Sequence, residues 1–146
     1  MYVPPFDSIL KSVGLDRPGF EVAHEVTIPK ELFRLLLQVA VAASDFNEAG
    51  YLAENPDIAE ALADGSVQDA RMHYVGFGFF EGRLGATPAV DERWYLAAYN
   101  DVAQAVRSGK VASASEHYNV AGAAEGRSPS GQYSTVAAQW KRALVS

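Results

Sequence analysis

The sequence predicts an all-α protein with two tandem three-helix repeats between flanking helices. Two observations lead to this fold class. Residues 47–83 align with residues 91–127 without a gap, at an offset of 44, and fifteen of the thirty-three positions from Tyr51 to Arg83 are identical. Within each segment, apolar residues recur at helical spacing between glycine, asparagine and proline breaks. We expect one domain over residues 1–146, with an N-terminal arm (1–28), a core helix (29–44), repeat 1 (45–88), repeat 2 (89–132) and a C-terminal helix (133–146).

The N-terminal arm contains the stretch FEVAHEVTI, residues 20–28, in which apolar residues alternate with others as they do in a strand. No second strand is evident in the sequence. The stretch is therefore expected either as an extended arm over the helices or as a contact through which the chain forms a homodimer.

The flanking helices are predicted from their apolar spacing. The run LFRLLLQVAVAA, residues 32–43, is too short and too polar to cross a bilayer, so we expect a buried core helix and no membrane insertion. The C-terminal helix is expected to turn four residues inward, namely Tyr133, Val136, Trp140 and Leu144.

Each repeat is divided into helices by capping and breaking residues. Asp45 and Glu48 have capping-box spacing and are expected to start a first helix. Asn55-Pro56 starts a second helix, which Gly65 ends in a left-handed conformation. Ser66 is expected to cap a third helix, which the following glycines end. The second repeat places the same signals 44 residues later.

The repeated pattern, YLAENPDI…HYVGFGFFEGR and YLAAYNDV…HYNVAGAAEGR, resembles a short helical repeat found in many bacterial proteins. The resemblance covers residues 45–130. Such units accompany glycosyltransferases of surface polysaccharide synthesis and large secreted proteins with calcium-binding repeats, and they also form small stand-alone proteins. The resemblance implies a helical accessory module without catalytic residues. The second unit departs from the pattern at Tyr99-Asn100, where Asn-Pro is expected.

The Glu-Gly-Arg triplets place one arginine at the same position of each repeat, Arg83 and Arg127. These arginines are candidates for binding an anion. Alternatively, each arginine pairs with an aspartate of its own repeat, Asp57 or Asp101. We favour the internal pairing, because both members of each pair recur at the same offset.

His73 and His117 also recur in register, each before a tyrosine. A two-histidine metal site or an acid–base pair is one interpretation. A repeat reuses what its fold requires, so we favour a structural histidine near a helix C-terminus. No His-x-x-x-His spacing is present, and we expect neither a metal site nor another cofactor.

The aromatic residues do not recur. Phe77, Phe79 and Phe80 become alanines in the second repeat, whereas Trp94 and Tyr99 replace Gly50 and Asn55. These five aromatic residues are the candidate binding residues, and the phenylalanines are expected either at the seam between the repeats or on a partner surface. The favoured function is a non-catalytic module that binds another protein in a surface-polysaccharide or envelope pathway. The alternative is a small-ligand or carbohydrate-binding protein with an aromatic groove between the repeats.

Charge and composition exclude some function classes. The net charge is −6, and residues 45–88 carry eight acidic groups against two basic ones. Binding of nucleic acid depends on clustered lysine and arginine, so we expect no nucleic-acid partner. The chain has no cysteine, which removes disulfides and thiol nucleophiles. No secretory leader is visible, and we expect a cytoplasmic protein.

Overall fold

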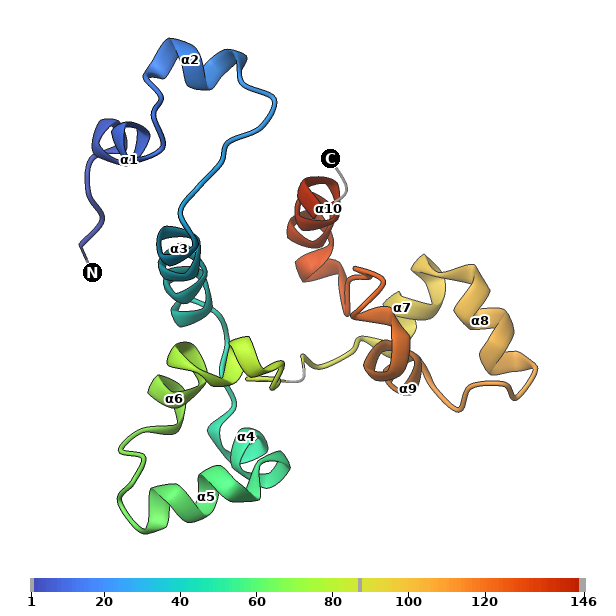
Figure 1. The fold of residues 1–146 in the computed structure, drawn as a ribbon. Helices are drawn as coiled ribbons and strands as arrows, with labels where there is room; N and C mark the ends of the chain where they lie inside the picture. The colour runs from blue at the N-terminus through green and yellow to red at the C-terminus, as the bar shows by residue number, and fades with distance from the viewer. Residues whose placement is uncertain (1, 87, 145–146) are drawn as a thin grey trace. The chain divides into compact units, whose positions relative to one another are not determined.

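The computed structural model describes residues 2–86 and 88–144, and these residues are helical over 63% of the structure and form no strand. The all-α fold class is confirmed. The contacts divide the chain into two compact units, Met1–Gly85 (unit 1) and Ala86–Ser146 (unit 2). In Figure 1, unit 1 runs from blue to yellow-green and unit 2 from yellow to red. The single domain expected over residues 1–146 stays a prediction.

The N-terminal arm differs from the extended segment that the alternation predicts. It contains two short helices, α1 (Phe6–Ser12) and α2 (Arg17–Val22). The side chain of Asp16 caps α2 by accepting a hydrogen bond from the Gly19 N–H, and proline lies in the first turn. Residues 20–22 of the alternating stretch are therefore helical, whereas residues 23–28 form neither helix nor strand. The Asp16 cap stabilises α2 locally, whereas the alternating residues have no partner strand with which to pair.

The predicted core helix is α3 (Lys30–Ala42), but it is not a buried helix. Within α3 only Val41 is buried, while Phe33, Leu35 and Leu36 are exposed. The helix is attached to α6 largely by two arginines. Arg34 donates a hydrogen bond to the carbonyl of Gly76, and Arg71 donates to the carbonyls of Ala42 and Ser44 at the C-terminal end of α3.

The first repeat forms the helices α4 (Glu48–Glu54), α5 (Pro56–Ala63) and α6 (Ala70–Gly76), followed by the 3₁₀ helix η1 (Gly78–Glu81). Two of the predicted caps were wrong. Asn47 rather than Asp45 caps α4, and Asp69 rather than Ser66 caps α6, since their side chains accept from an N–H three residues later. Gly65 follows α5 with φ of +82°, which confirms the left-handed C-cap.

Unit 2 forms the helices α7 (Glu92–Ala98), α8 (Asn100–Arg107) and α9 (Ala114–His117), then a π-helical turn η2 (Tyr118–Gly122), the 3₁₀ helix η3 (Gly131–Tyr133) and α10 (Ser134–Leu144). The starts of α7, α8 and α9 each lie 44 residues after those of α4, α5 and α6. The third helices differ, because α9 passes after one turn into η2 whereas α6 continues to Gly76.

A buried tyrosine stands at the centre of each unit. Tyr51 packs with Val41, Ile58, Ala70 and Tyr74 in unit 1. Tyr95 is fully buried in unit 2 and packs with Val102 and Ala114. The remaining apolar residues around the two cores are half-buried, so each unit has a small core that is centred on its tyrosine.

Glycine recurs opposite each tyrosine because the ring leaves no space for a side chain. A Cβ atom on Gly78 would collide with the Tyr51 hydroxyl, and one on Gly122 would collide with the Tyr95 hydroxyl. This contact explains why glycine is retained at both positions while the phenylalanines around Gly78 are not. The repeated glycine is therefore a packing requirement.

A backbone hydrogen bond joins the start of each repeat to its end. The Asn47 N–H donates to the carbonyl of Gly85 at 2.9 Å, and the Asp91 N–H donates to the carbonyl of Pro129 at 3.0 Å. The two donors lie 44 residues apart, as do the two acceptors. The chain thus enters each repeat beside the point from which it leaves that repeat.

The C-terminal helix α10 does not turn the predicted residues inward. Val136, Trp140 and Leu144 are exposed, and Tyr133 precedes the helix in η3. Among the described helices none is both long and apolar enough to span a membrane.

Candidate functional site

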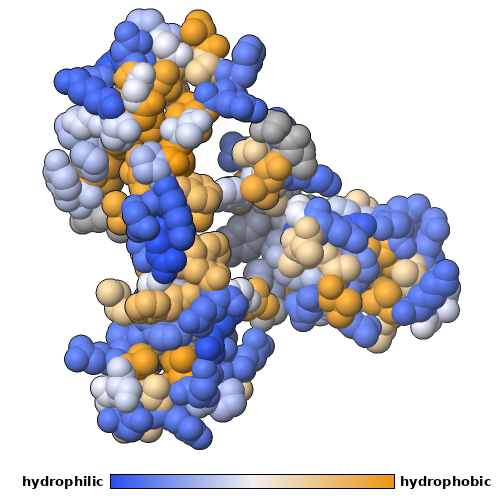
Figure 2. Space-filling model, viewed as in Figure 1, coloured by the Kyte–Doolittle hydropathy of each residue, from blue (hydrophilic) through white to orange (hydrophobic). Residues whose placement is uncertain are grey.

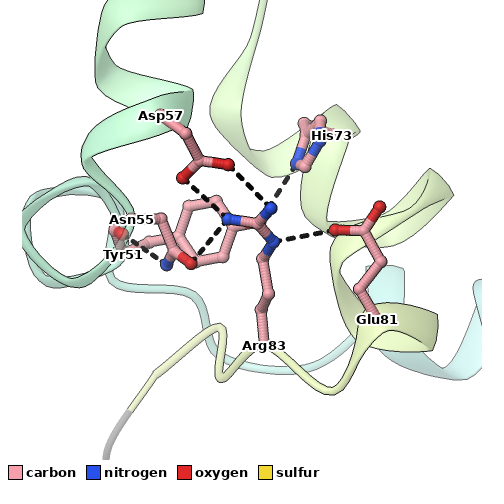
Figure 3. A network of polar contacts seen from close by, with 6 residues as sticks. All are labelled: Tyr51, Asn55, Asp57, His73, Glu81 and Arg83. Atoms are coloured by element: carbon pink, nitrogen blue, oxygen red, sulfur yellow. Dashed lines mark hydrogen bonds and ion pairs between the residues drawn. The ribbon is translucent and has the colours of Figure 1, made fainter.

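The arginine of the first Glu-Gly-Arg triplet is held by three side chains of unit 1 (Figure 3). Arg83 donates to both carboxylate oxygens of Asp57, at 2.9 and 2.8 Å. It also donates to Glu81 at 2.8 Å and to the side-chain carbonyl of Asn55 at 2.8 Å. Gly82 lies between Glu81 and Arg83 with φ of +79°, and this left-handed turn directs the arginine back toward α5.

Arg127 makes the same contacts in unit 2. It donates to both carboxylate oxygens of Asp101, at 2.9 and 2.7 Å, and to Glu125. Where unit 1 has Asn55, unit 2 has the ring of Tyr99, over which the guanidinium lies at 4.9 Å. The internal pairing of Arg83 with Asp57 and of Arg127 with Asp101 is confirmed.

These contacts lower the pKa of both aspartates. The hydrogen bond from Arg83 lowers the pKa of Asp57, and the hydrogen bond from Arg127 lowers the pKa of Asp101 to about 2. The same contacts raise the pKa of both arginines above the usual range. Each guanidinium already has two carboxylate partners, so these contacts do not favour the anion-binding interpretation.

Each central tyrosine is hydrogen-bonded to the histidine of its own unit. The Tyr51 hydroxyl lies 3.0 Å from His73 Nδ1, and the Tyr95 hydroxyl lies 3.1 Å from His117 Nδ1. Burial raises the pKa of both phenols, that of Tyr95 to about 12, so the phenols stay protonated at neutral pH. A buried hydroxyl requires such a partner, which makes hydrogen bonding to the tyrosine the observed structural role of each histidine.

The structure does not group the histidines with further metal ligands. Within residues 2–86 and 88–144, no three histidine, aspartate or glutamate side chains lie close enough together to hold a metal ion. His73 belongs to unit 1 and His117 to unit 2.

The three phenylalanines of the first repeat occupy different environments in unit 1. Phe77 is 60% exposed, and its ring lies 5.9 Å from that of His73. Phe79 lies edge-on to Phe80 at 5.3 Å. Phe80 is half-buried beneath the guanidinium of Arg34, which lies 4.0 Å from the ring centre. Phe80 therefore takes part in attaching α3, a role that the sequence pattern did not suggest.

The two candidate aromatic residues of the second repeat contribute to the core of unit 2. Trp94 and Tyr99 pack against the buried cluster around Tyr95. The rings of Tyr95 and Tyr99 lie 4.6 Å apart, and those of Trp94 and Tyr99 lie 6.0 Å apart. The Tyr99 hydroxyl also accepts a hydrogen bond from the Ser128 N–H at 2.8 Å. Both residues are therefore engaged in packing.

Two exposed apolar stripes were missed in the sequence, because their residues were expected to be buried. The α3 stripe consists of Phe33, Leu36 and Ala40, with Phe33 51% exposed and Leu36 43% exposed. The α10 stripe consists of Val136, Trp140 and Leu144, with Trp140 53% exposed. Apolar residues reach the viewed surface among hydrophilic ones in both units (Figure 2).

A signal for the α3 stripe was present in the sequence. The apolar residues of this helix line two neighbouring stripes, which is more than contact with one helix buries.

The repeated polar residues thus hold each unit together, while the apolar stripes of α3 and α10 remain available for contacts. The polar residues that recur are structural in their observed contacts, and the two apolar stripes lie outside the repeated helices, on α3 and α10. Comparisons with protein-family models, with curated proteins and with solved structures found no match to this chain.

Proposed function

We propose that the chain is a non-catalytic helical module that binds another protein. The observation that carries the proposal is the α3 stripe. Helix α3 is attached through Arg34, Arg71 and Val41, and its stripe residues Phe33 and Leu36 stay exposed. Exposed apolar side chains at i and i+3 on one helix are the usual anchors of helix-mediated recognition.

The repeated polar groups support a non-catalytic role. The histidines are hydrogen-bonded to buried tyrosines, and the arginines are paired with aspartates. A catalytic acid, base or anion-binding group would have to give up these contacts, on which the packing of each unit depends.

The biological setting follows from the resemblance of the repeated motif alone. We propose that the module serves a bacterial surface-polysaccharide or envelope pathway, as an accessory to enzymes of that pathway. A cytoplasmic location and a homodimer through residues 20–28 stay predictions, and the mass in solution would test the second. The carbohydrate-binding alternative also stays a prediction, and the packing of Trp94 and Tyr99 in unit 2 does not favour it.

The proposal is tested by purifying the tagged full chain from its host and identifying what co-elutes by mass spectrometry. The variant Phe33→Ser/Leu36→Ser is expected to lose the partner. Because both side chains are exposed, the variant should change the stability by no more than about 0.5 kcal/mol per substitution. The matched control is Val136→Ser/Trp140→Ser on α10. Recovery of the same proteins with the α3 variant as with the wild type would contradict the proposal.

A further inference from the structure

A hollow of about 250 Å³ opens beside His117 in unit 2. It lies where α9 passes into the π-helical turn η2. Such turns widen the helix locally and often occur at functional sites. The hollow is lined by Lys110, Val111, Glu116, His117, Val120 and Ala121.

The corresponding position in unit 1 is occupied by an aromatic ring. The residue 44 positions before Ala121 is Phe77, whose ring lies 5.9 Å from His73 with 33° between the ring planes. In unit 2 the corresponding histidine, His117, has an alanine at that place in the register. We infer that the hollow corresponds to the space that the Phe77 ring occupies in unit 1. The volume of the hollow is below that of most small-molecule sites.

Two charged residues, Glu116 and Lys110, lie at the rim of the hollow. The carboxylate of Glu116 accepts a hydrogen bond from the Ala112 N–H. Over the described part of the chain, the structure gives Lys110 no ion-pair partner. A cation beside an apolar, ring-sized space suits an aromatic group through cation–π attraction, and it suits a carbonyl next to that group.

We propose that this hollow binds one aromatic side chain, a phenylalanine or a tyrosine, from an exposed segment of the partner protein. The inference rests on the proposed function, because it names the chemistry of one contact with that partner. The ring lies over His117, and Lys110 contacts the adjacent carbonyl of the partner segment. Unit 1 binds no such ring, since Phe77 already fills the position.

The probe for this contact is N-acetyl-L-phenylalaninamide, titrated into the isotope-labelled full chain and followed by NMR. The amides of residues 110–121 are expected to shift, and those of residues 66–77 are not. N-acetyl-L-alaninamide serves as the control compound and should produce no such shifts. Equal shifts with both compounds would overturn the proposal.

Exchanging the side chains of the two units provides a stronger test. Ala121→Phe fills the hollow from within and should weaken binding of the probe about tenfold or more, equivalent to roughly 1.4 kcal/mol. Ala121→Leu provides the same test if the larger ring prevents folding. Phe77→Ala should create a second site, with new shifts at residues 66–77. Undiminished binding by both Ala121 variants, or no second site in Phe77→Ala, would overturn the inference.

Two further outcomes separate this inference from the proposed function. If the α3 variant keeps its partners while the probe still binds at residues 110–121 and Ala121→Phe abolishes that binding, the proposed function fails and the hollow stands as an aromatic site. If the wild-type chain self-associates in sedimentation and Ala121→Phe removes that association, the occupant is a second copy of this chain. That result would overturn the assignment to a different protein.

Discussion

Units 1 and 2 share a polar frame, but the aromatic rings of their cores come from different positions in the repeat. In unit 1, Phe46 lies just before α4, and its ring lies 5.3 Å from that of Tyr51 and 5.5 Å from that of Tyr74. In unit 2 the corresponding residue is Val90, and Trp94 and Tyr99 supply the rings from α7 and from the residue that follows it. The central tyrosine, its histidine and its glycine are the same in both. The geometry around the hydroxyl is thus restrictive, whereas the source of the surrounding rings is interchangeable.

The same comparison explains the reciprocal change of residue size between the repeats. Phe46 packs against the core of unit 1 and Tyr99 packs against the core of unit 2, whereas Phe77 is 60% exposed. Asn55, at the register of Tyr99, instead donates to the Tyr51 carbonyl and accepts from Arg83. A hydrogen-bonded amide and a ring beneath the guanidinium therefore fulfil the same role next to the arginine.

The largest effect is expected when the shared frame is broken. Gly122→Ala places a methyl group against the Tyr95 hydroxyl, and Tyr95 is 0% exposed and has no space to move. We expect a loss of about 3 kcal/mol in the free energy of unfolding, as for an overpacked core. Urea unfolding measures the loss, and hydrogen exchange should locate it in unit 2. Gly78→Ala should act in the same way on unit 1.

The matched control for this change is Gly76→Ala, because a Cβ atom on Gly76 has no heavy atom within 4 Å. Its stability should differ little from that of the wild type. Adding Tyr95→Phe to Gly122→Ala removes the atom that collides, so the double variant should lose less than the sum of the single variants. Strict additivity would show that the contact with the hydroxyl is not the reason for the glycine.

An intermediate effect on stability is expected when a ring of the unit 2 core is replaced by the residue that unit 1 has at the same position. Tyr99→Asn introduces the residue that unit 1 has at this position. The substitution removes the contact between the rings of Tyr99 and Tyr95, and it removes the hydrogen bond from the Ser128 N–H. We expect a loss of about 2 kcal/mol, below the usual cost of deleting a fully buried ring because Tyr99 is half-buried. Thermal unfolding measures the loss. Adding Val90→Phe should recover part of it, and no recovery would mean that the two cores are not interchangeable.

The smallest effect is expected at the ion pair of unit 2. In the folded chain the pKa of Asp101 is lowered from 3.8 to about 2. The unfolded state therefore binds more protons between these values, and the contribution of Asp101 is present above about pH 4 and is lost as the pH falls toward 2. Because this side chain is 63% exposed, the contribution should stay below about 1 kcal/mol.

Asp101→Asn should accordingly lower the stability at pH 7 and leave it nearly unchanged at pH 2. Chemical denaturation at both pH values measures the difference. Asp57→Asn is the matched variant in unit 1 and should show the same direction. A deficit of equal size at pH 7 and at pH 2 would show that the charge of Asp101 does not matter.

Features that recur in both repeats could be predicted from the sequence, whereas the exposure of helices α3 and α10 to solvent was not predicted. The pairing of Arg83 with Asp57 and the turn at Gly65 were predictable, because a requirement that recurs 44 residues later is visible twice. The cap of α4 was placed at Asp45 instead of Asn47, since both residue types accept hydrogen bonds from a helix N-terminus and the spacing alone does not separate them.

The exposure of α10 could not be predicted from its apolar spacing, and for α3 only the width of its apolar surface indicated it. A helical period predicts which residues share a face, but not whether another element covers that face. In unit 1 the contact between α3 and α6 depends on Arg34 and Arg71, two charged residues that no apolar pattern identifies. Trp94 and Tyr99 were named as candidate binding residues because aromatic identity does not show whether a ring packs internally, and both pack against the core of unit 2.

The hydrogen bonds from Asn47 to Gly85 and from Asp91 to Pro129 have a consequence for how such a chain can grow. Because the two ends of each repeat are hydrogen-bonded to each other, copying one repeat also copies the contact that closes it. Gene duplication can therefore add a unit without remodelling the units already present. The duplicated copy is then free to diverge wherever its frame is not involved, as the exchange of Phe77 for Ala121 illustrates.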